Sequence, residues 1–124
     1  MNLLLDTHAL LWWMNGDPLS GAAIAAIADP RTPVFVSAAA AWEIAIKSAL
    51  GKLSMERSVA ESLTDEGFDP LSISVAHAER AGALPPHHRD PFDRMMVAQA
   101  QIERLTIVTR DPVFSTYDVD VLAC

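Results

Sequence analysis

Short apolar runs alternate along the whole chain with longer stretches in which apolar residues recur at helical spacing. Such alternation is typical of βαβ units, whose parallel strands form a central sheet covered by helices. The predicted strands are the runs Leu3–Leu5, Val34–Val36, Leu71–Ile73, Leu105–Val108 and Val119–Leu122. We therefore expect an α/β fold with a central, mostly parallel β-sheet flanked by α-helices, in one domain over residues 1–124.

Residues that favour the start or the end of a helix stand at the ends of several predicted helices. Serine can cap a first turn, an Asp-Pro pair favours a helix start, and glycine favours a helix end. These residues are Ser20, Ser37, Ser74, Asp90-Pro91 and Gly51. The predicted helices are Ala9–Met14, 21–28, 38–50, Met55–Glu66, Val75–Ala83 and 91–104.

The composition favours a soluble protein with a core of its own. With 51% hydrophobic residues among 124, the chain can bury one core without a metal or a disulfide. Its single cysteine, Cys124, has no intramolecular partner, which favours a reducing cytoplasm. Met1–Leu5 is too short for a signal peptide, and no window reaches the roughly 18 uninterrupted apolar residues of a membrane span. We expect a cytoplasmic protein that does not enter membranes.

The net charge is −7, from 16 acidic and 9 basic residues. By itself this balance argues against a nucleic-acid-binding protein, which usually carries a basic surface. Acidic residues gathered in a cleft would bind divalent cations, whereas dispersed ones would keep the protein soluble. The positions of the acids decide between these two interpretations.

Four carboxylates are predicted to meet at one edge of the sheet. Asp6 ends the first predicted strand, and Asp111 follows the fourth. Glu43 and Asp93 lie close to the starts of two predicted helices. Because helices in right-handed βαβ units begin at the edge where the strands end, we expect all four side chains at that edge.

Each acid also has a structural interpretation. Asp6 could cap the next helix, and Asp93 could interact favourably with the dipole of its own helix. Glu43 could pair with Lys47 one turn further on, and Asp111 could begin a turn. The helix around Glu43 is apolar nearly all round, which favours burial of this acid over a surface pair. Separate structural roles would also leave the shared edge unexplained.

Carboxylates that lie close together repel one another unless a cation binds between them. Oxygen ligands without a thiolate cluster favour Mg²⁺ or Mn²⁺. Two such ions about 4 Å apart can activate a water molecule and neutralise the leaving oxygen of a phosphodiester. The predicted centre therefore suits phosphodiester hydrolysis.

Four segments carry a specific resemblance to a known family. They are LLDTHALLW from Leu4, VSA from Val36 with WEIAIK from Trp42 and GKL from Gly51, HRDPFDRMMVAQA from His88, and LTIVTRD from Leu105. In this order, and over essentially the whole chain, they resemble PIN-domain proteins, in particular the VapC-type toxins of bacterial toxin–antitoxin pairs.

This resemblance implies a PIN fold and a Mg²⁺- or Mn²⁺-dependent endoribonuclease that hydrolyses RNA and is often a homodimer. Asp6, Glu43 and Asp93 match the catalytic, metal-binding acids, and Asp111 matches a fourth acid whose contribution varies within the family. The resemblance also implies a cognate protein antitoxin, whose C-terminal segment blocks the acidic groove.

Polar residues beside the acids are candidates for contact with RNA. Thr7, Ser37 and Thr109 could hydrogen-bond a ligand carboxylate or a metal-bound water. Basic residues in or near the motifs could hold phosphates. These residues are Arg89, Arg94, Arg110 and Lys47.

Some assignments have two interpretations. Arg94 could pair with Asp90, and Asp90 could be a helix cap or an acid that supports the centre. Trp12 and Trp13 could face an antitoxin or the core, whereas Trp42 is expected in the core.

Other classes of protein fit less well. A haloacid-dehalogenase-type phosphatase needs a second Asp two residues after the first, where this chain has His8. A Ser/His/Asp hydrolase needs a G-x-S-x-G turn, which the sequence lacks. A transition-metal site around His87-His88 has no regular ligand spacing. The remaining alternative is a PIN-fold binding module without nuclease activity, and the intact set of four acids speaks against it.

Overall fold

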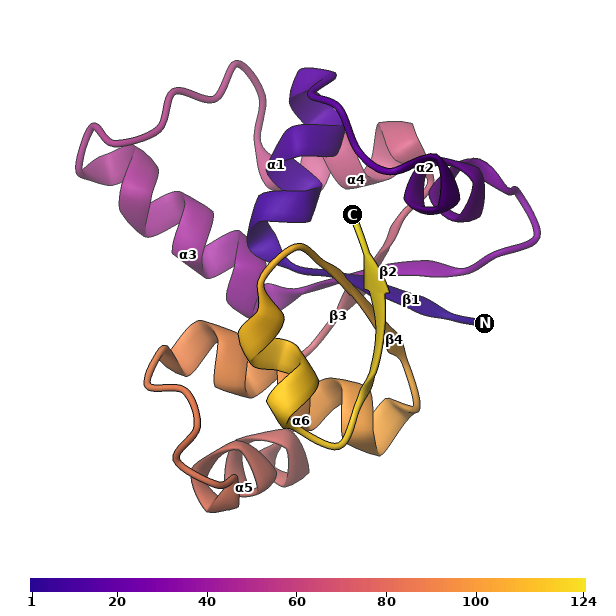
Figure 1. The fold of residues 1–124 in the computed structure, drawn as a ribbon. Helices are drawn as coiled ribbons and strands as arrows, with labels where there is room; N and C mark the ends of the chain where they lie inside the picture. The colour runs from indigo at the N-terminus through magenta and orange to yellow at the C-terminus, as the bar shows by residue number, and fades with distance from the viewer.

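The computed structural model describes residues 1–124, and its five strands form one sheet. The strands are β1 (Leu3–Leu5), β2 (Val34–Ser37), β3 (Asp69–Leu71), β4 (Thr106–Thr109) and β5 (Asp120–Ala123). Their order is β3-β2-β1-β4-β5, so β1 lies at the centre (Figure 1). All neighbouring pairs are parallel, which confirms the predicted α/β fold with a central parallel sheet.

The central strand β1 forms the middle of the core. Its Leu4 pairs with Phe35 of β2 and with Ile107 of β4, and all three of its leucines are fully buried. A parallel strand that is covered on both faces is continuously apolar, because neither row of side chains meets water. The unbroken run Leu3–Leu5 therefore follows from the position of β1 in the sheet.

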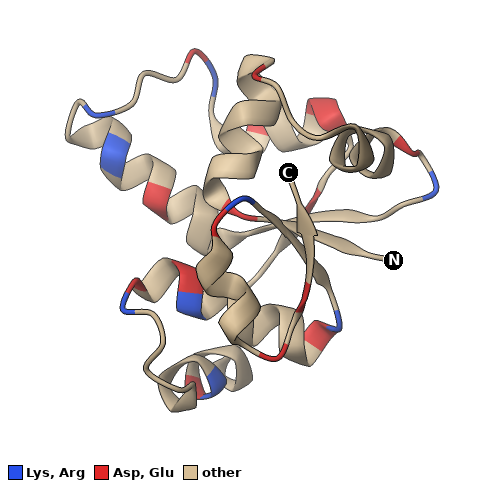
Figure 2. Ribbon diagram, viewed as in Figure 1, with Lys and Arg blue, Asp and Glu red and all other residues tan.

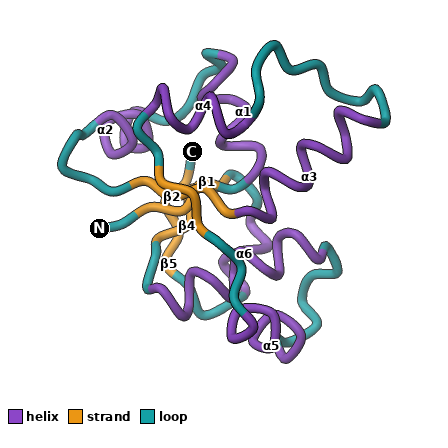
Figure 3. The backbone as a smooth tube through the Cα atoms, turned by 180° about the vertical axis from the view of Figure 1, so that it is seen from behind, coloured by secondary structure: helices purple, strands orange, loops and turns teal.

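Helices cover both faces of the sheet. They are α1 (Thr7–Asn15), α2 (Gly21–Ala28), α3 (Ala38–Ala49), α4 (Val59–Glu66), α5 (Val75–Ala83) and α6 (Pro91–Glu103), with a 3₁₀ helix, η1, at Pro112–Thr116. Figures 1 and 3 show α1, α2 and α4 on one side of the sheet and α5 and α6 on the other. Helix α3 starts at the carboxyl end of β2 and packs against both α1 and α6. None of the helices is long and apolar enough to cross a membrane.

The third strand lies two residues earlier than predicted. Its register pairs Phe35 with Asp69, and it ends at Leu71, so the prediction of Leu71–Ile73 is wrong. Ile73 stands 38% exposed in the segment that leads to α5. Because β3 is an edge strand, it tolerates a polar residue and a proline, and these hide it from a search for apolar runs.

Two helices begin at other residues than predicted, in each case directly after a capping residue. Helix α1 starts at Thr7, two residues before the predicted start, because Asp6 caps it. Helix α4 starts at Val59, because Ser58 caps it, so the predicted start at Met55 is wrong. The helix η1 was not predicted, and the other boundaries agree within one residue.

Candidate metal centre

Three elements bring acidic side chains to the carboxyl end of the central strands. Asp6 follows β1 directly, Glu43 lies in the second turn of α3, and Asp93 lies in the first turn of α6. Figure 2 shows acidic positions on α3 and at the start of α6, where the two helices lie beside each other. The structure therefore places these three acids at one end of the sheet, where the charge of Glu43 acts on Asp93.

Asp6 is buried and both of its carboxylate oxygens accept hydrogen bonds. Oδ1 accepts from the backbone N–H of Ala9 at 2.7 Å, and Oδ2 accepts from the hydroxyl of Thr109 at 2.5 Å. Burial raises the pKa of Asp6 above its ordinary value, while these two hydrogen bonds lower it. Asp6 is thus both a helix cap and a buried acid of the centre.

Glu43 is also buried, as the apolar surroundings on its helix predicted. The hydroxyl of Thr7 donates to its Oε1 at 2.7 Å, and Nζ of Lys47 lies 2.9 Å from its Oε2. The pair with Lys47 therefore exists, and it joins the buried carboxylate of Glu43 to a half-buried lysine. Thr7 directly follows Asp6 in the chain, so its hydrogen bond links Glu43 to the start of α1 beside Asp6.

Asp93 shares a short hydrogen bond with a histidine that was not predicted for the site. Nε2 of His88 lies 2.7 Å from Oδ2 of Asp93. Burial raises the pKa of Asp93 to about 6, opposed by this bond and assisted by the charges of Asp90 and Glu43. In the sequence, His88 begins the third of the four family-like segments, five residues before Asp93, but no spacing rule predicts their contact.

Asp111 lies at the rim of the centre. It is exposed, and its Oδ1 caps η1 by accepting from the N–H of Val113 at 3.0 Å. Its own N–H donates to the hydroxyl of Thr109 at 3.1 Å. Burial is the main cause that raises the pKa of Asp6, and the negative charge of Asp111 adds to it. The predicted fourth acid is therefore near Asp6 but faces solvent.

The three predicted hydroxyl residues differ in their contacts. Thr7 and Thr109 each donate to a carboxylate of the centre. Ser37 is fully buried, and its Oγ accepts from the N–H of Ala39 at 2.9 Å as the cap of α3. Ser37 therefore fixes the start of the helix that carries Glu43 and bonds none of the acids.

Arg94 does not pair with Asp90. Its guanidinium donates to four backbone carbonyl oxygens and to the hydroxyl of Tyr117. Asp90 instead caps α6, because its Oδ1 accepts from the N–H groups of Phe92 and Asp93 at 2.8 and 3.2 Å. The hydrogen bonds of Arg94 give it a structural role, and its contact with RNA stays a prediction.

Arg110 lies over an aromatic ring beside the centre. Its guanidinium carbon is 3.9 Å from the ring centroid of Trp12, and its Nη2 donates to the carbonyl oxygens of Pro18 and Cys124, each at 3.0 Å. Trp12 is half-buried under this contact. Arg110 itself remains exposed, so a phosphate can reach it.

The prediction that Trp42 lies in the core is wrong, because this residue is 62% exposed. Its ring meets the edge of Phe92 at a centroid distance of 5.3 Å. The periodicity of α3 predicted burial all round, but the helix lies at the end of the sheet and only one of its faces meets the core.

The donor set of the centre fits a hard divalent cation. Asp6 and Glu43 supply buried carboxylate oxygens and Asp93 supplies half-buried ones, and burial is the main cause that raises the pKa of Asp6 and of Asp93. A divalent cation between them would offset this cost of burying like charges. Oxygen donors favour Mg²⁺ or Mn²⁺, and His88 is the one imidazole hydrogen-bonded to these acids.

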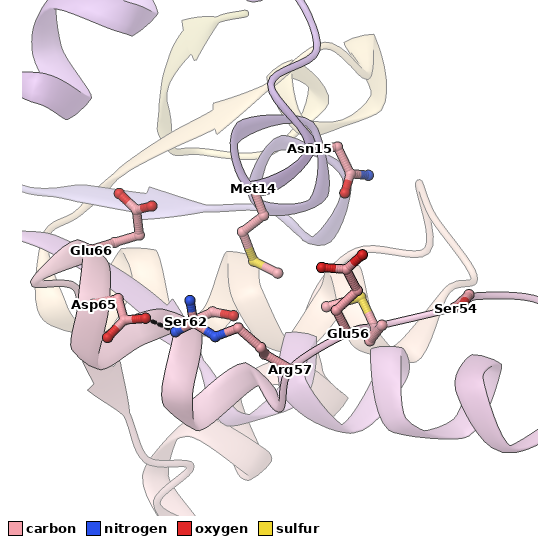
Figure 4. A pocket seen from close by; sticks show the side chains of 9 residues that line it. Met14, Asn15, Ser54, Glu56, Arg57, Ser62, Asp65 and Glu66 are labelled. Carbon is pink, nitrogen blue, oxygen red and sulfur yellow. Dashed lines mark ion pairs between the residues drawn. The ribbon is translucent and has the colours of Figure 1, made fainter.

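One cavity of the molecule lies away from the acidic centre. It has a volume of about 430 Å³ and lies between the end of α1, the segment after α3, and α4 (Figure 4). Arg57 and Asp65 form an ion pair in its wall, and Met14 and Asn15 close it from α1. None of the four acids lines this cavity.

The chain belongs to the PIN-domain family, whose model matches residues 3–120. A relative that is 40% identical over 67 residues is the ribonuclease VapC16 of Mycobacterium tuberculosis. This match covers 49% of the chain and 48% of that relative, so it spans about half the length of each.

Several solved structures share the fold. The structures of VapBC2 of Rickettsia felis and of VapBC of Salmonella typhimurium, both bound to DNA, each match with a TM-score of 0.74. Their matched chains are 16% and 17% identical, and the matches cover 100% and 99% of this chain and 99% and 98% of theirs. FitAcB of Neisseria gonorrhoeae matches with a TM-score of 0.66 at 20% identity, over 97% of this chain and 96% of that one. At these identities the comparison shows the PIN-like fold.

Proposed function

We propose that this chain is a metal-dependent endoribonuclease, the toxin of a toxin–antitoxin pair, which hydrolyses RNA phosphodiester bonds. The observation that carries the proposal is that Asp6, Glu43 and Asp93 all lie at the carboxyl end of the sheet, with Asp6 and Glu43 buried and Asp93 half-buried. Membership of the PIN family and similarity to a ribonuclease support it. The proposal takes residues 1–124 as one domain that acts in the cytoplasm.

The three acids would hold Mg²⁺ or Mn²⁺, and Asp111 would act as a fourth ligand on the solvent-facing side of the cation. The bound cation would supply an activated water molecule and neutralise charge on the leaving oxygen. Thr7 and Thr109 keep two of the acids in fixed orientations through their hydroxyl groups. Lys47 partly neutralises Glu43, so that the acids can stay close together.

The exposed cations beside the centre would bind the substrate. We assign a phosphate contact first to Arg110, because it is exposed and its position is fixed by Trp12. Phosphate contacts position RNA without reading its sequence. Ser37 and Arg94 would affect substrate binding indirectly. Ser37 fixes the start of α3, and Arg94 fixes the loop between α5 and α6.

Two protein partners belong to the proposal, a cognate antitoxin and a second copy of this chain. The exposed face of α3 supports a protein partner because every residue on it is apolar. Its members are Ala38, Trp42, Ala45, Ile46, Ala49 and Leu50.

The spacing along this face suits a second copy. Trp42 and Leu50 each lie one helical turn from Ile46. An antiparallel pair of α3 helices with Ile46 on a two-fold axis would therefore place Trp42 of each copy against Leu50 of the other. Such self-complementarity is what an interface with two-fold symmetry requires.

The test is cleavage of labelled single-stranded RNA with Mg²⁺, with Mn²⁺ and with EDTA. Asp93→Asn removes one acid but keeps an oxygen for His88, and Asp118→Asn is the matched control at an exposed acid outside the centre. We expect cleavage only with metal, and its loss only in Asp93→Asn. Equal cleavage by wild type and Asp93→Asn would overturn the proposal, and an inert wild type free of any partner would favour the binding-module alternative.

A further inference from the structure

His88 contacts Asp93 but is neither one of the acids that would bind the cation nor a residue assigned to the substrate. Its Nε2 lies 2.7 Å from Oδ2 of Asp93, and the two side chains are only 25% and 19% exposed. We propose that His88 is a positioning residue, which holds Oδ2 of Asp93 so that the other carboxylate oxygen faces the cation. This inference rests on the proposed function, because it concerns the same centre.

Hydrogen bonds fix the backbone of His88 from two sides. Its N–H donates to the hydroxyl oxygen of Tyr117 at 2.9 Å, and its carbonyl oxygen accepts from Nη1 of Arg94 at 3.2 Å. The hydroxyl of Tyr117, a buried residue, donates in turn to the carbonyl oxygen of Pro85 at 2.9 Å. Side chains from two other parts of the fold therefore set the direction from which the imidazole reaches Asp93.

Arg94 also holds the loop that leads to His88. Its guanidinium donates to the carbonyl oxygens of Ala81, Leu84 and Pro85 at 2.9, 3.0 and 3.0 Å. The planar guanidinium presents its donors in a fixed geometry, so it can tie several carbonyl groups together. The loop between α5 and α6 (Figure 1) is thus fixed without regular secondary structure, and it presents His88 as a rigid hydrogen-bond donor.

The contact leaves Asp93 with one defined orientation. Its backbone is already fixed in the first turn of α6, where the cap Asp90 bonds its N–H at 3.2 Å. The remaining freedom is rotation of the carboxylate, which the bond from His88 removes. Partners that orient metal ligands in this way typically contribute about 10- to 100-fold to metal affinity or activity.

The same atoms allow a different arrangement, in which His88 binds the cation directly. Ligand atoms of His88, Asp90 and Asp93 lie within 4.8 Å of one another. The structure favours positioning, because Oδ1 of Asp90 is already used by two backbone N–H groups and Nε2 of His88 is already bonded to Asp93. Direct ligation is one of the outcomes that the experiment distinguishes.

The experiment compares Mn²⁺ affinities of the full chain without RNA, from the paramagnetic resonance signal of unbound Mn²⁺. His88→Ala removes the donor, and His88→Gln supplies an N–H donor that is a poor metal ligand. The matched control is His87→Ala, which removes the neighbouring imidazole, whose ring lies tilted against that of Tyr117. We expect His88→Ala to weaken Mn²⁺ binding by about 10- to 100-fold, and His88→Gln and His87→Ala to stay close to wild type.

Unchanged affinity in His88→Ala would overturn the proposal, and so would an equal loss in His88→Gln, which would indicate direct ligation. Should His88→Ala fail to fold, Tyr117→Phe removes only the hydroxyl that holds His88 and is expected to weaken Mn²⁺ binding in the same direction. Unchanged affinity in a folded Tyr117→Phe would then contradict the proposal.

A wild type that binds no Mn²⁺ overturns both this inference and the proposed function. A wild type that binds Mn²⁺ without cleaving RNA contradicts only the function, and the affinities still decide the role of His88.

Discussion

At the scale of single residues, Asp6 combines two roles that are usually separate. Its Oδ1 caps α1 through the N–H of Ala9, and its Oδ2 accepts a hydrogen bond from Thr109. Asparagine can cap a helix as well as aspartate can, but it brings no charge to a cation. The two substitutions Asp6→Asn and Asp6→Ala therefore separate the structural role from the chemical one.

We expect Asp6→Asn to lower RNA cleavage by about 100-fold or more, because a cation centre contributes several kcal/mol to the reaction. Its free energy of unfolding should stay near that of wild type. Asp6→Ala should lose the same activity and in addition about 1 kcal/mol of stability, the usual value of an N-cap. Cleavage rates and urea unfolding measure the two effects. Active Asp6→Asn protein would show that the charge of Asp6 is not needed.

Asp93 predicts how stability depends on pH when metal is absent. Burial, opposed by the bond from His88, raises its pKa from 3.8 to about 6 in the folded protein. The folded state therefore binds this proton more tightly than the unfolded chain does. As pH rises from about 4 to about 6, the free energy of unfolding should fall, by at most about 3 kcal/mol, and then level off.

Urea unfolding over this pH range, in EDTA, measures the effect. Asp93→Asn should lack this part of the pH dependence, because its side chain does not titrate. Identical pH profiles for wild type and Asp93→Asn would contradict the assignment of the raised pKa to this residue.

At the scale of elements, the exposed face of α3 gives a prediction about assembly. Ile46→Glu would place two like charges opposite each other on the proposed two-fold axis, so we expect it to convert a dimer to a monomer. Val75→Glu, at a residue of α5 that is 77% exposed, is the matched control and should leave the dimer intact. Light scattering after size-exclusion chromatography, over a series of protein concentrations, gives the mass. A wild type that stays monomeric throughout, or a dimeric Ile46→Glu, would contradict the proposed interface.

The elements also show what the sequence can and cannot predict. Strands β1, β2 and β4 are found by their apolar runs because both of their faces are buried, and the ends of β1 and β4 then locate Asp6 and Asp111. The edge strand β3 lacks that signal. Periodicity also misplaced Trp42, because it reports which residues are apolar and not which face of a helix meets the core.

The contact between His88 and Asp93 could not be predicted from the sequence, for a different reason. The path of the loop depends on Arg94 and Tyr117, and Tyr117 lies 29 residues after His88 in the chain. Hydrogen bonds of this kind follow no sequence spacing. The acids could be predicted from the topology of the sheet, whereas the residues that orient them required the structure.

At the scale of the whole molecule, charge and cation binding are linked. The chain carries a net charge of −7, and Figure 2 shows its Lys and Arg positions scattered over separate elements. A divalent cation that binds only the folded centre stabilises the fold by mass action, by about 2.7 kcal/mol at 100 times its dissociation constant.

We therefore expect Mn²⁺ to raise the melting temperature of wild type by several degrees and that of Asp93→Asn by much less. Ca²⁺-free buffer and an equal ionic strength of NaCl control for general screening. Differential scanning calorimetry is the measurement. An equal rise in both proteins would place the stabilising cation outside the proposed centre.

The most direct test of the central claim is to measure Mn²⁺ occupancy and RNA cleavage in the same titration, with wild type and Asp93→Asn side by side. If one centre binds the cation and cleaves RNA, the two curves of wild type should rise together, and both should shift to higher Mn²⁺ or vanish in Asp93→Asn. Cleavage that persists unchanged in Asp93→Asn while its Mn²⁺ occupancy falls would contradict the account.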